Sequence, residues 1–260
     1  MGQKMGWLPL VLLFLATACN HDSGDSTSND PLALHYKIIR KLPHDTTAFT
    51  QGLEFFKGVL YEGTGEKGES QLRKVDLATG KVLQKVDLDK AYFGEGITIF
   101  GDKIYQLTWQ NHVVLQYDLS FNLLRQFTLR TEGWGMTHDS THLIISDGSS
   151  MIYYRDPATL DSVRVINVTD GSNLVNNINE LEYIHGFIYA NIWQTDYIYK
   201  IDPATGNVVG KADFSNLLKH EGETVYDSNA VLNGIAYDDQ TGKLYITGKY
   251  WPAMFEIQFQ

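Results

Sequence analysis

The sequence predicts an all-β domain built from a repeated four-stranded unit, and three observations support this. From Leu34 onward, short segments of alternating apolar and polar residues are separated by Gly, Asp and Asn, a pattern typical of strands joined by turns. The chain is rich in aromatic residues (12%), which favour strands. Similar segments recur about every 40 to 50 residues, the period of a four-stranded propeller blade.

The repeat contains five units, which open at Gln51, Glu95, Gly133, Asn179 and Asn233. A recurring Asp-x-x-Thr-Gly pattern predicts a tight turn between the third and fourth strands of a unit. The fifth unit stops after three strands, and an additional strand over 35–42 precedes the first unit. If that strand completes the last unit, both termini share one blade and the ring has no open edge. The sequence therefore predicts a five-bladed β-propeller over residues 34–260.

The first 33 residues have a different character. Lys4 precedes an apolar run over 7–18 that is short for a membrane span, and small residues then lead to Cys19. This pattern resembles a bacterial lipoprotein signal over 1–19, in which Cys19 is lipidated. Ala16 replaces the usual leucine, so ordinary signal cleavage remains an alternative. Residues 20–33 are polar and predict a flexible tether. We therefore expect an exported periplasmic or outer-membrane-anchored lipoprotein.

Composition narrows the classes of partner. The net charge of −10 argues against nucleic acid, which requires a basic surface. Cys19 is the only cysteine, so no intramolecular disulfide can form and packing alone must hold the fold. We expect a monomer whose contact with the membrane is limited to the lipid anchor.

The segment around Glu95 is the first candidate for chemistry. Glu95 lies between Gly94 and Gly96, which we expect to permit an unusual backbone conformation that aims the carboxylate into a cleft. A turn at 101–102 predicts a hairpin that returns to Trp109, on the adjacent strand near the same end. Apolar neighbours raise the pKa of a carboxyl group, so Glu95 is a plausible general acid/base.

The other unusual residues fall at equivalent positions of the repeat. They enter the first strand of a unit or end the second, so they would all rim one mouth of the central channel. Entering first strands are Phe49, Gln51, Phe93, Glu95, Trp134, Asn179 and Asn233; ending second strands are Trp109, Trp193 and Lys249. Indoles, one acid, one base and amides around one opening predict a pocket for a small substrate.

Several motifs occur in an order that resembles the glutaminyl cyclases of the plant and bacterial type. They are Phe-Thr-Gln-Gly-Leu at 49–53, Phe-Gly-Glu-Gly-Ile-Thr at 93–98, Gly-Trp-Gly-Met at 133–136, Ile-Asn-Glu-Leu-Glu at 178–182, Asn-Ile-Trp at 191–193 and Leu-Asn-Gly-Ile-Ala at 232–236. The resemblance extends from about Leu34 to the C-terminus. It implies a five-bladed propeller that converts the N-terminal glutamine of peptides to pyroglutamate with release of ammonia, without a cofactor or catalytic metal.

The resemblance also assigns roles. Glu95 matches the catalytic carboxylate, and it would carry a proton from the substrate's α-amine to the leaving ammonia. The chemistry of the reaction also requires a group that stabilises the oxyanion, and Lys249, Asn179 and an indole N–H are the candidates among which the sequence does not decide. The remaining pocket residues implied to bind substrate are Phe49, Gln51, Phe93, Trp109, Trp134 and Trp193, with Asn233 nearby.

Two other functions fit parts of the pattern. In a metal-dependent hydrolase or lactonase, Glu95, Asn179 and Asn233 would be oxygen ligands of calcium. Lys249 at the same mouth argues against this, because its ammonium would repel the ion. A non-catalytic propeller that binds a partner in the cell envelope is the second alternative, but it does not explain an acid and a base surrounded by indoles.

Overall fold

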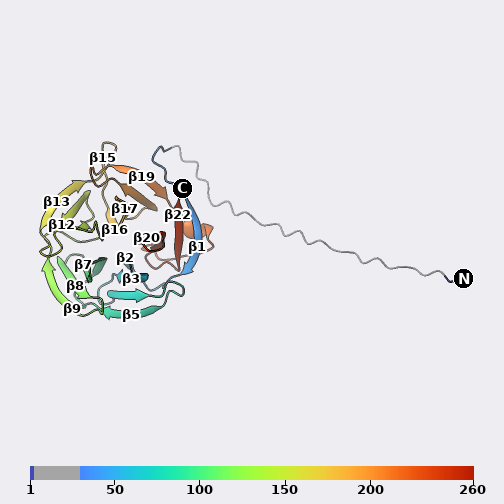
Figure 1. The fold of residues 1–260 in the computed structure, drawn as a ribbon, viewed down its shortest axis with the longest axis horizontal. Coiled ribbons are helices and arrows are strands. Elements are labelled where there is room, and N and C mark those ends of the chain that lie inside the picture. The colour runs from blue at the N-terminus through green and yellow to red at the C-terminus, as the bar shows by residue number, and fades with distance from the viewer. Residues whose placement is uncertain (3–29) are drawn as a thin grey trace.

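The computed structural model describes residues 1–2 and 30–260. Five four-stranded antiparallel sheets surround a central axis as the blades of a propeller (Figure 1). Within the described part of the chain, no helix has the length and apolar character needed to cross a membrane. Cys19 and residues 3–18 of the predicted signal peptide lie outside the described residues.

Each blade is ordered from the axis outward. Blade 1 contains β2 (Thr50–Phe56), β3 (Val59–Thr64), β4 (Gln71–Val75) and β5 (Val82–Asp87). Blade 2 contains β6 (Gly94–Phe100), β7 (Lys103–Thr108), β8 (Val113–Asp118) and β9 (Leu123–Thr128). Blade 3 contains β10 (Met136–His138), β11 (Leu143–Ser146), β12 (Met151–Arg155) and β13 (Ser162–Asn167). Blade 4 contains β16 (Ile178–Ile184), β17 (Phe187–Ile192), β18 (Tyr197–Ile201) and β19 (Val208–Asp213).

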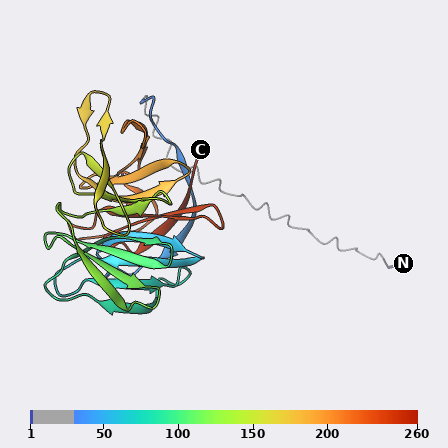
Figure 2. The same cartoon turned by 60° about the vertical axis from the view of Figure 1, so that its left-hand side comes forward.

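Blade 5 confirms the predicted closure of the ring. Its inner three strands are β20 (Leu232–Asp238), β21 (Lys243–Gly248) and β22 (Ala253–Phe259), and β1 (Tyr36–Pro43) forms its outer strand. β1 pairs with β22 from Tyr36 opposite Phe259 to Pro43 opposite Ala253. Both ends of the fold therefore share one sheet, as Figures 1 and 2 show for the blue β1 beside the red β22.

Among residues 30–260, a short hairpin and one short helix lie outside the blades. The hairpin of β14 (Thr169–Asp170) and β15 (Asn173–Leu174) connects blade 3 to blade 4, and α1 (Leu217–His220) follows blade 4. Leu32 and Ala33, at the end of the predicted tether, lie against β19 together with Leu34: the Lys211 N–H donates to the Leu32 carbonyl over 2.7 Å, and the Leu34 N–H donates to the Lys211 carbonyl over 2.8 Å.

Apolar side chains fill the spaces between neighbouring blades. Leu53, Ile97, Leu181 and Ile235, on the inner strands of four blades, are 0–1% exposed. The outer strands β5, β9 and β13 are mostly exposed, although half of their residues are apolar, among them Leu83 and Leu124. The core is thus a ring of apolar layers that fixes the blades around the axis.

Glycines on the inner strands permit the blades to approach closely. A Cβ at Gly52 would lie 2.4 Å from the Ile97 nitrogen, and one at Gly135 would lie 2.0 Å from the Asn179 carbonyl oxygen. Gly96 also has no room for a Cβ, which would lie 2.7 Å from backbone atoms of blade 3. Neither Gly94 nor Gly96 has a positive φ, so the expectation of an unusual backbone there is wrong. At Gly52, Gly96 and Gly135, lack of space rather than conformational freedom requires glycine.

Candidate active site

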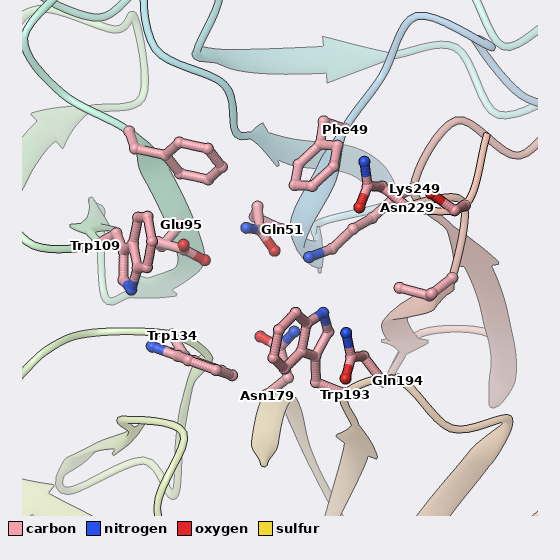
Figure 3. Close-up of a pocket in the computed structure, with 13 residues that line it drawn as sticks. Phe49, Gln51, Glu95, Trp109, Trp134, Asn179, Trp193, Gln194, Asn229 and Lys249 are labelled. Carbon is pink, nitrogen blue, oxygen red and sulfur yellow. The ribbon is translucent and has the colours of Figure 1, made fainter.

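A cavity of about 260 Å³ opens at the end of the channel where the first strands begin. Every site residue predicted from the sequence lines it except Asn233, and Figure 3 shows their side chains converging on one space. The lining residues are Phe49, Gln51, Phe93, Glu95, Trp109, Trp134, Asn179, Trp193, Gln194, Ser228, Asn229, Val231 and Lys249.

One position of the repeat supplies the centre of the site. Gln51, Glu95 and Asn179 each lie near the start of an inner strand, and Trp134 holds the equivalent place just before β10. The pairing register shifts between Thr50 and Gly52 in blade 1, and equivalent shifts occur beside Glu95, Asn179 and Asn233. Such β-bulges redirect a side chain from the ladder, here into the channel mouth.

A second repeated position places the other functional side chains. Trp109, Trp193 and Lys249 each follow the second strand of a blade. Their backbone N–H groups donate to the segment that enters the first strand: Trp109 to the Phe93 carbonyl (3.0 Å), Trp193 to Asn177 (2.8 Å) and Lys249 to Val231 (2.9 Å). The same backbone contact thus directs three different side chains into the cavity.

Five aromatic residues line the cavity: Phe49, Phe93, Trp109, Trp134 and Trp193. Phe93 packs edge-on against Phe49 and Trp109, with centroid distances of 5.9 and 5.7 Å. Trp134 and Trp193 meet at 90° with centroids 5.5 Å apart. Gly148, at φ +79°, lies under the Trp134 ring, since a Cβ there would approach within 2.6 Å of Trp134 Cζ2. The wall is rigid and apolar, which favours a neutral substrate side chain.

Glu95 and Lys249 are both 4% exposed, and both extend into the cavity from opposite sides (Figure 3). Burial raises the pKa of Glu95 well above its usual range; Lys249 opposes this rise and Glu132 adds to it. Burial lowers the pKa of Lys249 to about 8, against the influence of Glu95 and Glu66. The Lys249 ammonium also lies 4.5 Å from the centre of the Phe49 ring. The pKa of Glu95 is therefore shifted upwards and that of Lys249 downwards, and both shifts lower the cost of proton transfer between these groups and an amine near neutral pH.

Among the predicted site residues, Asn179 and Asn233 each have a buried side-chain oxygen without a hydrogen-bond partner in the described part of the chain. Asn179 is 2% exposed, and its Oδ1 accepts no hydrogen bond from any residue that the structure describes. It lines the cavity, so this oxygen can accept an N–H from a bound amine or amide. Asn233, in contrast, lies behind the wall: its Nδ2 donates to the Thr50 carbonyl (2.9 Å) and to Gln51 Oε1 (3.4 Å). The structure thus places Asn233 as a support for Gln51.

Several residues of the site carried no signal in the sequence. Gln194, Ser228, Asn229 and Val231 line the cavity from the turn after β17 and from the irregular segment before β20. Glu132 lies behind the wall, where its Oε2 accepts the indole N–H of Trp109 (2.9 Å) and of Trp134 (3.0 Å). In the sequence, the position of Glu132 two residues before Trp134 is the one feature that connects it with the site.

A propeller with a buried acid and base in an aromatic cavity defines a class of enzyme that performs proton transfer on a small, largely uncharged group. The glutamine cyclotransferase family model matches residues 10–259, and the chain belongs to this family. It is 36% identical over 241 residues to a glutaminyl-peptide cyclotransferase of Arabidopsis thaliana, covering 92% of this chain and 75% of the plant protein.

Comparison with solved structures supports the same family assignment. The crystal structure of Myxococcus xanthus glutaminyl cyclase superposes with a TM-score of 0.83 at 36% identity, covering 89% of this chain and 99% of that one. A Bacteroides caccae protein of unknown function matches with a TM-score of 0.50 at 15% identity, covering 63% of this chain and 66% of the other. This second likeness concerns the fold alone.

Proposed function

We propose that this chain is a glutaminyl-peptide cyclotransferase, which converts the N-terminal glutamine of peptides and proteins to pyroglutamate and releases ammonia. The observation that carries the proposal is the pairing of Glu95 with Lys249 in one aromatic cavity of a chain that belongs to the glutamine cyclotransferase family. The open mouth would hold the remainder of the peptide, while the cavity holds its first residue.

The aromatic wall supplies proximity. The substrate's α-amine must approach its own γ-amide carbon, so the glutamine side chain must fold back on itself. Rings at Phe93, Trp109, Trp134 and Trp193 limit the space for an extended conformer. Holding the reacting atoms in contact converts much of the activation entropy into binding, and well-oriented intramolecular reactions gain about 7–11 kcal/mol in this way.

Glu95 transfers the proton. The α-amine nitrogen forms a bond to the γ-carbon, and the carbonyl π electrons move to oxygen. Glu95 accepts a proton from that nitrogen and gives it to the γ-amide nitrogen. The oxyanion then re-forms the carbonyl, the C–N bond breaks and ammonia leaves. An α-amine titrates near pH 8, so the raised pKa of Glu95 brings donor and acceptor close together.

Lys249 is the donor that we assign to the oxyanion. The indole N–H groups of Trp109 and Trp134 already donate to Glu132, so they are not available to the substrate. The ammonium of Lys249 is buried and faces Glu95, and a charge held in a dry cavity stabilises a developing anion strongly. Asn179 Oδ1 would accept an N–H of the substrate. The same ammonium disfavours the calcium-hydrolase alternative, since it would oppose a cation bound at Glu95.

Release of ammonia from a model substrate tests the proposed function directly. The purified chain is incubated with a glutaminyl dipeptide, and ammonia and the corresponding loss of mass from the peptide are measured. Glu95→Gln should keep the fold and substrate binding while kcat falls by about 10²–10⁴, the usual contribution of a general acid/base. No ammonia from the wild-type chain would exclude the function. Near-normal kcat in Glu95→Gln would exclude Glu95 as the proton carrier, and a loss confined to KM would make it a binding group.

We further propose that the protein is an exported lipoprotein that acts as a monomer in the periplasm or at the outer membrane. The support is the pattern over 1–19 and the polar segment after it. Each buried methylene of an acyl chain contributes about 0.8 kcal/mol to membrane attachment. Cys19→Ser should therefore move the protein from the membrane fraction to the soluble one, and a soluble wild type would contradict lipidation.

A further inference from the structure

We propose that Glu132 is a positioning residue of the active site, whose single oxygen Oε2 fixes two indoles and turns their N–H groups away from the substrate. The inference rests on the proposed function, but part of its test does not. Trp109 comes from blade 2 and Trp134 from the entry to blade 3, and Glu132 lies between β9 and β10. Its Oε2 lies 2.9 Å from Trp109 Nε1 and 3.0 Å from Trp134 Nε1.

The direction of the two rings supports this role. In Figure 3 the nitrogens of Trp109 and Trp134 lie near each other on the side away from Lys249, and the carbon parts of the rings face the cavity. Glu132 itself does not line the cavity. An indole nitrogen is a donor only, so one carboxylate oxygen satisfies each ring completely. Hydrogen bonds to a charged acceptor are about twice as strong as neutral ones.

Neighbouring contacts show why the carboxylate is needed. The Trp134 ring rests on Gly148 and meets Trp193 edge-on, and Trp109 meets Phe93. These contacts involve the ring carbons, whereas the N–H edge of each indole is held by its hydrogen bond to Glu132. Glu132 thereby sets the direction of the N–H group in both indoles. It thereby joins the two halves of the aromatic wall across the boundary between blades 2 and 3.

As a consequence, different residues supply the apolar contacts and the polar interactions with the substrate. Trp109 and Trp134 present ring carbon to the glutamine side chain and shape it, while the polar interactions are left to Glu95, Lys249 and Asn179. If Glu132 were absent, either indole could rotate its N–H into the cavity and hold the substrate amide in an unreactive position. A misplacement of about 1 Å can cost about 10² in rate.

The first test compares two variants of Glu132. Glu132→Gln keeps an oxygen that can accept both N–H groups, and Glu132→Ala removes it. We expect kcat/KM of Glu132→Ala to fall by about 10²-fold and Glu132→Gln to retain most of the wild-type value. In Glu132→Gln the acid limb of the pH profile should move to lower pH, since the charge that raises the pKa of Glu95 is lost. Glu69→Gln, an exposed carboxylate on the loop between β3 and β4, is the matched control for loss of one charge.

The second test asks whether Glu132 acts through the indoles. Phenylalanine at both Trp109 and Trp134 keeps a ring and removes the N–H. In that double variant, Glu132→Ala should change kcat/KM by less than about twofold, the limit of additivity for independent sites. An unchanged 10²-fold loss in that background would overturn the proposal, as would a Glu132→Gln variant as damaged as Glu132→Ala, or a fully active Glu132→Ala.

The third test needs no activity. The indole ¹H–¹⁵N resonances of Trp109 and Trp134 are assigned with single phenylalanine variants, and both should shift and exchange faster with water in Glu132→Ala. The indole of Trp251, which donates to the Ala230 carbonyl over 3.1 Å, is the internal reference and should not move. Unshifted resonances for Trp109 and Trp134 would contradict the proposal even if the proposed reaction were correct.

Discussion

Replacement of Lys249 by methionine should stabilise the fold and impair the reaction at the same time. The ammonium is 4% exposed, and burial lowers its pKa from the usual 10.5 to about 8. Each pKa unit corresponds to about 1.4 kcal/mol, so holding this charge in the cavity costs the folded state about 3 kcal/mol. Below pH 8 both the folded and unfolded states carry the proton, so the full cost is present at neutral pH.

Methionine has similar length and no charge. Lys249→Met should remove that cost, and 1 kcal/mol raises the melting temperature of a domain of this size by about 2–4 °C. The stability of the wild type should rise as the pH increases from about 8 towards 10.5, because only the folded state then loses the proton, and the variant should lack this rise. If Lys249 stabilises the oxyanion, kcat should fall by about 10²–10³.

Thermal unfolding and steady-state ammonia release on the same preparations measure both effects. Lys67→Met, at an exposed position on the loop between β3 and β4, removes one charge without touching the cavity and is the matched control. A lower melting temperature in Lys249→Met would refute the argument from burial. An unchanged kcat would mean that another group binds the oxyanion, whatever the effect on stability.

Two further predictions concern metal and pH. Chelation with EDTA should leave ammonia release unchanged, because Glu95 is the only carboxylate among the described residues that line the cavity, and an ammonium shares the cavity with it; loss of activity that calcium or zinc restores would favour the hydrolase alternative. His44 is buried, which opposes its protonation, but Glu62 at 2.9 Å and the Trp251 carbonyl outweigh burial and raise its pKa. This contribution to stability is present below the unfolded pKa of about 6.5 and is lost as pH rises through the raised folded value. The difference in unfolding free energy between wild type and His44→Gln should be about 3–5 kcal/mol at pH 6 and shrink at higher pH, and a constant difference would contradict this.

The fold could be predicted from the sequence because the repeat is regular. Alternation predicted the strands, and the missing fourth strand of blade 5 predicted that β1 pairs with β22. The equivalent positions in the repeat also identified most of the cavity wall, since residues at one place in each blade must meet around the axis. Trp109 and Lys249 were found in this way, although they are far apart in the chain.

The residues that escaped prediction depend on contacts that no periodicity encodes. Asn229 and Val231 come from an irregular segment whose path follows tertiary packing. Glu132 is recognisable only when two indoles from different blades are seen to donate to the same oxygen. Asn233 occupies the right position of the repeat but supports Gln51 from behind the wall, a difference set by local side-chain packing.

The site combines a shared backbone position with divergent side chains. Gln51, Glu95, Trp134, Asn179 and Asn233 occupy the same place in the five blades. In four blades the next residue is a glycine that lets the strands approach; in blade 4 it is Glu180, whose carboxylate accepts the N–H groups of Leu53 (3.3 Å) and Ile235 (2.9 Å). Close packing of the blades therefore constrains the residue that follows each site residue, whereas the site residue itself is free to vary. Substitution of a site residue changes the chemistry of the mouth without moving its walls, which explains how an acid, an indole and amides meet in one cavity of a symmetric fold.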